Sequence, residues 1–87
     1  MKWPFPAPDK KRFEELRQKP PEVAISIWLQ GEFTIGEEPA LLEAIRDGLS
    51  LRLDDGEITE IICDCMDDDL SAPQCKERLF KASHLKA

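Results

Sequence analysis

Apolar positions along the chain follow two periods, which together predict a mixture of strands and helices. Within residues 23–29, alternate positions are Val, Ile, Ile and Leu, the period of two that is typical of a strand. β-branched and aromatic residues favour the same interpretation. A short buried helix is the competing interpretation, because Pro21 precedes the run and Gly31 follows it. We take residues 23–29 as a strand.

Two further strands are predicted in the middle of the chain. Leucines alternate with polar residues over 49–53, and the Asp-Gly pair that begins at Asp55 is a strong hairpin signal. The residues that follow, 57–65, would form the second strand of this hairpin. They also fit helical spacing, with Asp54 as the N-cap and Glu57 three residues later as a capping box. The Asp-Gly pair favours the strand.

Three segments have the features of helices. The clearest is 37–47, which has Pro39 in its first turn and Gly48 directly after its end. An N-terminal helix is predicted from Lys10 to about Gln18, and a C-terminal helix over 72–85.

The predicted fold class is therefore α+β, a small single domain over residues 9–87. The alternative is an all-α bundle of four to five short helices. Every second residue from Pro4 to Pro8 is proline, which predicts a Pro-rich extended arm over residues 1–8. Trp3 and Phe5 on this arm are candidate aromatic anchors for a partner or for a second copy of the chain in a homodimer.

Acidic and basic residues are segregated along the chain, and this distribution narrows the classes of partner that the protein is expected to bind. Residues 32–70 hold 13 carboxylates and two basic side chains, whereas the segments on either side carry a small excess of basic residues. The net charge of −6 repels phosphate, so no direct nucleic-acid binding is expected. An acidic surface of this kind attracts basic protein surfaces instead.

Some of the acidic side chains are expected to stabilise turns and the N-terminal ends of helices. Once these are set aside, the candidate partner-binding residues are Glu57, Glu60, Asp64, Asp67, Asp68 and Asp69. Internal pairing of this patch with Lys76 and Arg78 is the alternative to a partner.

The three cysteines and His84 are residue types that bind zinc, but their spacing is unsuitable. Cys63 and Cys65 form a C-x-C pair, whereas structural zinc sites use C-x₂₋₄-C pairs. Cys75 and His84 are nine residues apart, so a continuous helix would direct them to opposite sides. We predict no metal and no cofactor. A zinc module using Cys63, Cys65 and Cys75 is the alternative function.

No catalytic motif, phosphate-binding loop or segment of membrane-spanning length is apparent in the sequence. Three cysteines without a secretory signal favour the reducing cytoplasm. We therefore expect a cytoplasmic, non-enzymatic interaction module, an inhibitor or adaptor. Its expected partner is a basic protein, for example a nucleic-acid-binding protein.

Overall fold

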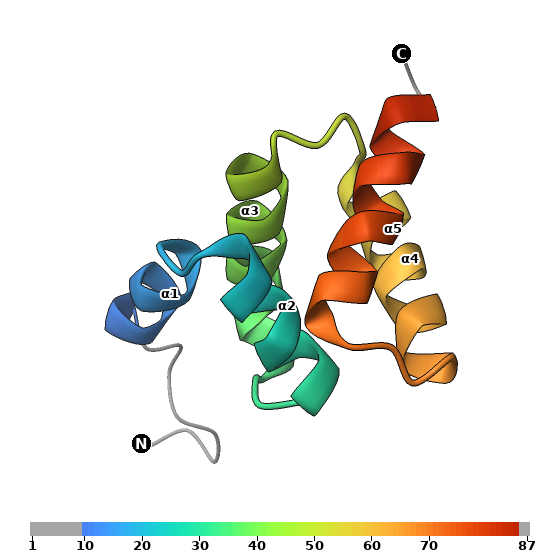
Figure 1. Ribbon diagram of the computed structural model, residues 1–87. Coiled ribbons are helices and arrows are strands. Elements are labelled where there is room, and N and C mark those ends of the chain that lie inside the picture. The colour runs from blue at the N-terminus through green and yellow to red at the C-terminus, as the bar shows by residue number, and fades with distance from the viewer. Residues whose placement is uncertain (1–9, 86–87) are drawn as a thin grey trace.

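Helices form all the regular structure in residues 10–85, the part of the chain that the computed structural model describes (Figure 1). In chain order they are α1 (Lys10–Arg17), α2 (Pro21–Gln30), the 3₁₀ helix η1 (Ile35–Glu37), α3 (Glu38–Leu49), α4 (Asp55–Asp67) and α5 (Ala72–Leu85). The α+β prediction is wrong, since this range contains no strand. The all-α alternative describes the fold.

Residues 23–29 form the body of α2 and not a strand. Ala24 and Trp28, four residues apart, are buried, whereas Val23 is 42% exposed. This is the pattern of a helix with one face in the core. A proline occupies the first turn, and Gly31 ends the helix in the left-handed conformation with φ of 69°. Because nearly every residue of this run is apolar, it fits the period of a strand and that of a helix equally well. The proline and the glycine at its two ends are what identify it as a helix.

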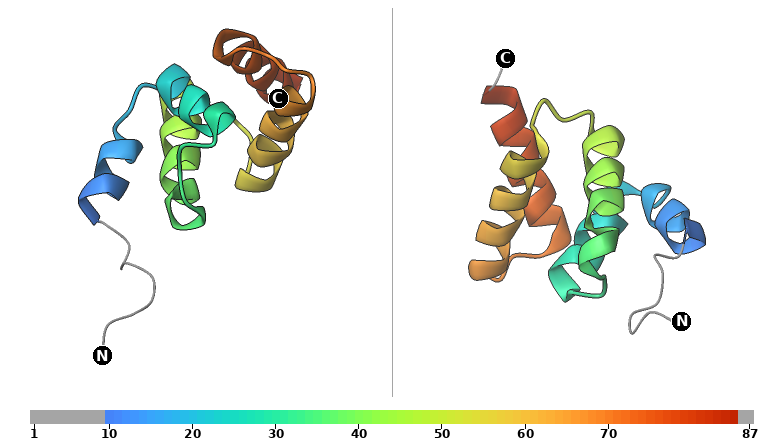
Figure 2. Two further views of the ribbon diagram at one scale, coloured as in Figure 1. Left: turned by 90° about the horizontal axis from the view of Figure 1, so that it is seen from below. Right: turned by 180° about the vertical axis from the view of Figure 1, so that it is seen from behind.

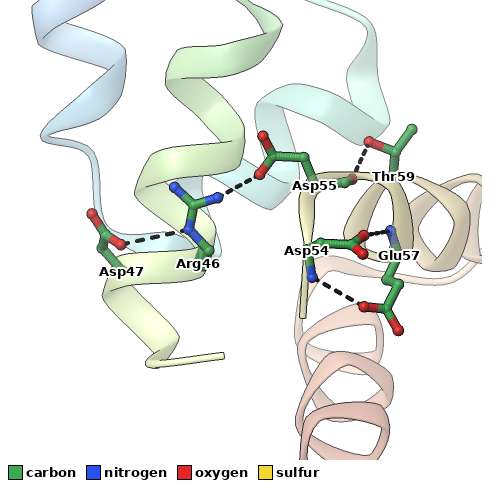
Figure 3. Close-up of polar contacts among 6 residues, drawn as sticks. All are labelled: Arg46, Asp47, Asp54, Asp55, Glu57 and Thr59. Atoms are coloured by element: carbon green, nitrogen blue, oxygen red, sulfur yellow. Dashed lines mark hydrogen bonds and ion pairs between the residues drawn. The ribbon is translucent and has the colours of Figure 1, made fainter. Parts of the chain in front are cut away.

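Residues 57–65 also lie in a helix, α4, because a capping box starts it. The Asp54 carboxylate accepts a hydrogen bond from the Glu57 amide at 2.8 Å, and the Glu57 carboxylate accepts one from the Asp54 amide at 3.1 Å (Figure 3). Two amides that a helix start leaves without a partner are thereby satisfied. The Asp-Gly pair beginning at Asp55 forms the first turn of α4 and not a hairpin.

Residues 49–53 alternate as predicted but do not form a strand. Leu51 and Leu53 are at most 8% exposed, whereas Arg52 between them lies at the surface. The Arg52 amide donates a hydrogen bond to the Ser83 hydroxyl of α5 at 2.7 Å. The linker between α3 and α4 therefore inserts two leucines into a core made by helices.

The three predicted helices are present as α1, α3 and α5. The largest difference is at the end of α3, which runs past the predicted end at residue 47. Gly48 consequently lies inside the helix, and Ser50 takes the left-handed position after it with φ of 52°.

The helices are arranged as two groups that share one core. Figure 1 shows α1 and α2 packed against α3, and α4 and α5 side by side as an antiparallel pair. Figure 2 shows from below that α5 also lies against α2, which joins the two groups. The largest fully buried side chains are Leu16, Ile25, Leu41, Ile45, Ile58, Ile62 and Leu79. The predicted Pro-rich arm lies outside the described residues.

Candidate protein-binding surface

The core sets the orientation of α4 about its own axis. Ile58, Ile62 and Cys65 have no exposed surface, and their spacings of four and three residues place them on one face of the helix. Burying such side chains favours folding by about 1.5–3 kcal/mol each. The residues on the opposite face of α4 are therefore held toward solvent.

Four of the predicted acidic residues fall on one side of α4. Glu57, Glu60, Asp64 and Asp67 follow one another at intervals of three, four and three residues. At 100° per residue they lie within about 80° of one another around the axis and span about 15 Å along it. Glu60, Asp64 and Asp67 are exposed, and we call these three residues the acidic stripe.

A strand over 57–65 would direct Glu60 and Asp64 outward, as the helix does. It would also direct Ile58 and Ile62 outward and Cys63 toward the core, whereas both isoleucines are fully buried. A helical period replaces the alternation, so that Cys63 is exposed.

The N-terminal end of α4 is tied to its own cap and to α3. Glu57 belongs to the capping box, and the Thr59 hydroxyl donates a hydrogen bond to the backbone carbonyl of Asp55 at 2.8 Å. The Arg46 guanidinium of α3 pairs with the Asp55 carboxylate (Figure 3). These contacts occupy the acidic residues around the start of α4, so the surface open to a partner begins at Glu60.

Internal pairing involves only part of the predicted patch. Arg78 of α5 pairs with Asp68 at 2.9 Å. The hydrogen bond to Asp68 raises the pKa of Arg78, and the charges of Asp68 and Asp64 raise it further. Lys76 does not join the patch, because its ammonium pairs with Glu22 of α2 at 3.0 Å.

The acidic stripe has no ion pair with any residue in the 10–85 range, although Arg78 lies near enough to influence Asp64. Elsewhere in that range basic side chains are commonly paired: Arg12 with Glu37, and Arg17 with Glu14 and Glu43. The stripe is thus a region of unneutralised negative charge on a helix held in place by the core.

Apolar surface lies on the same helix, with Cys63 next to the stripe and Met66 about 100° around the axis from Asp67. Met66 is 45% exposed, and the Cys63 thiol is exposed as well. Methionine is a flexible, polarisable side chain that adapts to irregular partner surfaces. The sequence did not indicate that Met66 is exposed, because Met66 lies just beyond the strand predicted over residues 57–65.

Asp69 has a structural role at the end of α4. It adopts φ of 55°, and the Leu70 amide donates to the Cys65 carbonyl at 2.9 Å. The Asp69 amide donates to the Met66 carbonyl at 3.1 Å. This pair of bonds is a Schellman motif, in which the left-handed position is most often glycine. Asp69 therefore shapes the turn into α5, a role that an aspartate did not signal in the sequence.

The cysteines do not converge on one point. Cys65 and Cys75 are fully buried in the core, whereas Cys63 is exposed on another side of α4. Burial raises the pKa of the Cys75 thiol to about 12, and the neighbouring Cys65 adds to that rise. Within residues 10–85 no group of three or more His, Cys, Asp or Glu side chains is arranged to hold a metal ion.

A second surface feature lies on α5, away from the acidic stripe. An open hollow on α5 is lined by Phe80, Lys81, His84 and Leu85 and includes no residue of the acidic stripe. Trp3 and Phe5, the predicted aromatic anchors, lie outside the described residues. Across residues 10–85, none of the helices combines the length and apolar content that a membrane crossing requires.

Comparisons with known protein families, with curated proteins and with solved structures found no match to this chain. Any functional conclusion therefore depends on the surface itself.

Proposed function

We propose that this chain is a non-enzymatic interaction module, an adaptor or inhibitor, that docks the outward face of α4 on a basic protein surface. The observation that carries the proposal is the acidic stripe: Glu60, Asp64 and Asp67 are exposed on one side of one helix, without ion pairs among the described residues. Asp69 at the end of α4 is exposed as well, whereas Asp68 is paired with Arg78.

The electrostatics favour a basic partner in two ways. Like charges held close together on one surface concentrate the negative potential, which speeds encounter with a basic surface over about 8 Å at physiological salt. A partner's Lys or Arg side chains would also reduce the repulsion among the stripe carboxylates. Net charge of −6 acts in the same direction at longer range.

The mixed chemistry of the face favours a protein over a small cation. Interfaces combine apolar and charged groups, and the exposed Met66 lies at the edge of the exposed surface of α4, on the far side of Cys63 from the stripe. Rim charges mainly control association rate and salt dependence, whereas a buried Met contributes to residence time. A nucleic-acid-binding protein is one basic partner that fits, because carboxylates on the stripe would occupy places otherwise taken by phosphates.

The fold supports a binding role because α4 needs no rearrangement to present this face. The helix is capped at its start, closed by a Schellman motif at its end and buried along its inner side. A preorganised surface avoids the entropic cost of ordering on binding. The reducing cytoplasm remains the proposed location, where the three thiols would stay free.

The test compares two variants of equal charge. In one, the stripe is neutralised by Glu60→Gln, Asp64→Asn and Asp67→Asn. In the matched control, Glu15→Gln, Glu32→Gln and Glu77→Gln remove three exposed carboxylates from other parts of the chain. Each protein is immobilised at the same density and exposed to cell extract, and bound proteins are quantified as salt rises.

We expect the stripe variant to lose basic partners by about tenfold, since three exposed charges at about 0.5 kcal/mol each give about 1.5 kcal/mol. The control should keep them. Equal retention by both variants, or an identical loss in both, would contradict the proposal, because binding would then follow net charge and not the α4 face.

A further inference from the structure

The outward face of α5 lies between two flanks that contact neighbouring elements. On one flank Lys76 pairs with Glu22 of α2 at 3.0 Å, and on the other Arg78 pairs with Asp68, just after α4, at 2.9 Å. The inner face is buried in the core. Figure 1 and the right view of Figure 2 show that the last turn of α5 projects past the ends of the other helices. The residues between the two flanks are therefore open to solvent.

This outward surface combines apolar and charged side chains. Its exposed residues are Glu77, Phe80, Lys81 and His84, which we call the α5 face. At 100° per residue they fall within about 100° of one another around the helix axis. Phe80 is 45% exposed, Leu85 at the end of the helix is 87% exposed, and both line the open hollow on α5. Exposed apolar side chains gathered around a hollow are typical of an interaction site.

The order of charges along the α5 face is complementary to itself when reversed. The acidic Glu77 precedes Phe80, and the basic Lys81 and His84 follow it. If two copies of α5 pack antiparallel with Phe80 at the two-fold axis, position 77 lies level with position 83 of the second copy. Lys81 and His84 of that copy are then within about 1.5–3 Å of the same level along the helix. A parallel pair would instead place like charges opposite each other.

We propose that the α5 face is a self-association site, on which α5 of a second copy of this chain packs antiparallel. The two Phe80 rings meet at the centre and cover the hollows of both copies. Each Glu77 pairs with Lys81 of the other copy, and the two-fold axis makes this contact twice. Both residues are available for it, since neither has an ion pair within residues 10–85. The site includes no residue of the acidic stripe, so the inference is independent of the proposed function.

The small size of the contact predicts a transient dimer. One helix from each copy buries less than the roughly 1,200 Å² in total that a stable specific interface needs. The net charge of −6 on each copy also opposes association at long range. At physiological salt that repulsion is screened beyond about 8 Å, whereas groups in direct contact are screened less. We therefore expect a reversible equilibrium of monomer and dimer, with the dimer favoured at high protein concentration.

Sedimentation equilibrium of the full chain, in reductant and at micromolar to millimolar concentration, measures this association. Glu77→Lys and Lys81→Glu should each weaken the dimer by about tenfold, because one substitution removes both symmetry-related ion pairs and places like charges together. Combining the two substitutions exchanges the charges within each copy and should restore the dimer. Glu32→Lys, which makes the same change in net charge outside α5, is the control and should leave the dimer as in the wild type.

Three results would overturn the inference: a wild type that stays monomeric throughout, a dimer that both single variants retain, or a combined variant that fails to recover it. Amide chemical shifts of the wild type during dilution give a check that needs no variant. The largest changes should fall on residues 77–85. Changes concentrated on residues 1–9 or on α4 would assign the self-association to another surface and contradict the proposal.

Discussion

Two ordinary residues in this protein hold a backbone conformation that usually belongs to glycine. Ser50 after α3 and Asp69 after α4 have φ of 52° and 55°, and each closes its helix with the bonds of a Schellman motif. A side chain with a Cβ atom costs about 1 kcal/mol in this region. Both helix ends therefore contain strain that glycine would relieve.

Ser50→Gly should raise the free energy of unfolding by about 0.5–1 kcal/mol, because glycine adopts this φ without a steric penalty. The matched control is Ser26→Gly inside α2, where the same substitution should lower it by about 0.5–1 kcal/mol. Urea denaturation of the two variants measures both effects. Destabilisation by Ser50→Gly would contradict the account of this helix end.

The Cys75 thiol should make the fold sensitive to alkaline pH. Its pKa is raised from 9.0 to about 12 by burial, so above pH 9 the unfolded chain loses this proton before the folded chain does. The contribution of Cys75 to the free energy of unfolding is constant below pH 9. It then falls toward pH 12 by at most about 1.4 kcal/mol per pH unit.

Urea titrations at pH 8 to 11 in the presence of reductant measure this slope. Cys75→Ala should flatten it, whereas Cys63→Ala, at an exposed thiol, should leave it as in the wild type. An unchanged slope in Cys75→Ala would show that other titrating groups cause the loss of stability at alkaline pH.

At the scale of elements, the sequence predicted helices best where end signals and apolar period agreed. α1, α3 and α5 were found in this way. In α2 and α4 the two kinds of signal conflicted, because a dense apolar run satisfies both periods. The Pro and Gly at the ends of α2, and the Asp54–Glu57 capping box of α4, were the correct guides. The Asp-Gly pair after Asp54 was misleading, since it serves equally well as a first helical turn.

The acidic surface was predictable in part for the same reason. Glu60 and Asp64 are outward in either interpretation, because both are charged and lie four residues apart, a spacing that keeps them on one side of a strand or of a helix. Their alignment with Asp67 into one stripe depends on the helix, and so does the exposure of Met66. The pairing of Lys76 with Glu22 depends on how α5 lies against α2, which local sequence does not specify.

Packing of α2 on α3 gives an element-scale prediction at Gly48. A Cβ atom there would come within 2.8 Å of the Pro21 ring, although alanine normally stabilises a helix interior by about 1 kcal/mol over glycine. We expect Gly48→Ala to be destabilising by about 1–3 kcal/mol, as overpacking is. Gly36→Ala, where no atom lies within 4 Å, is the control and should be nearly neutral. A stabilised Gly48→Ala protein would show that the two helices are not in close contact.

Across the whole molecule, the fold determines which charged side chains are paired with one another and which face solvent. Most arginines of the described chain are paired with carboxylates, and helix termini take up further acidic groups. Of the exposed carboxylates that have no ion pair in residues 10–85, three lie together on the outer face of α4, whereas Glu15, Glu32 and Glu77 are scattered over other parts of the chain. The central claim is that this face, and not the net charge alone, determines what the protein binds.

Amide chemical-shift mapping with a short oligolysine peptide tests that claim most directly. The wild type and the variant with Glu60→Gln, Asp64→Asn and Asp67→Asn are each titrated at low salt and again at high salt. We expect the largest shifts in the wild type to fall on residues 60–69 and to vanish with salt. The variant should lose them. Shifts spread evenly over the acidic residues of α1, α3 and α4, and unchanged in the variant, would contradict it.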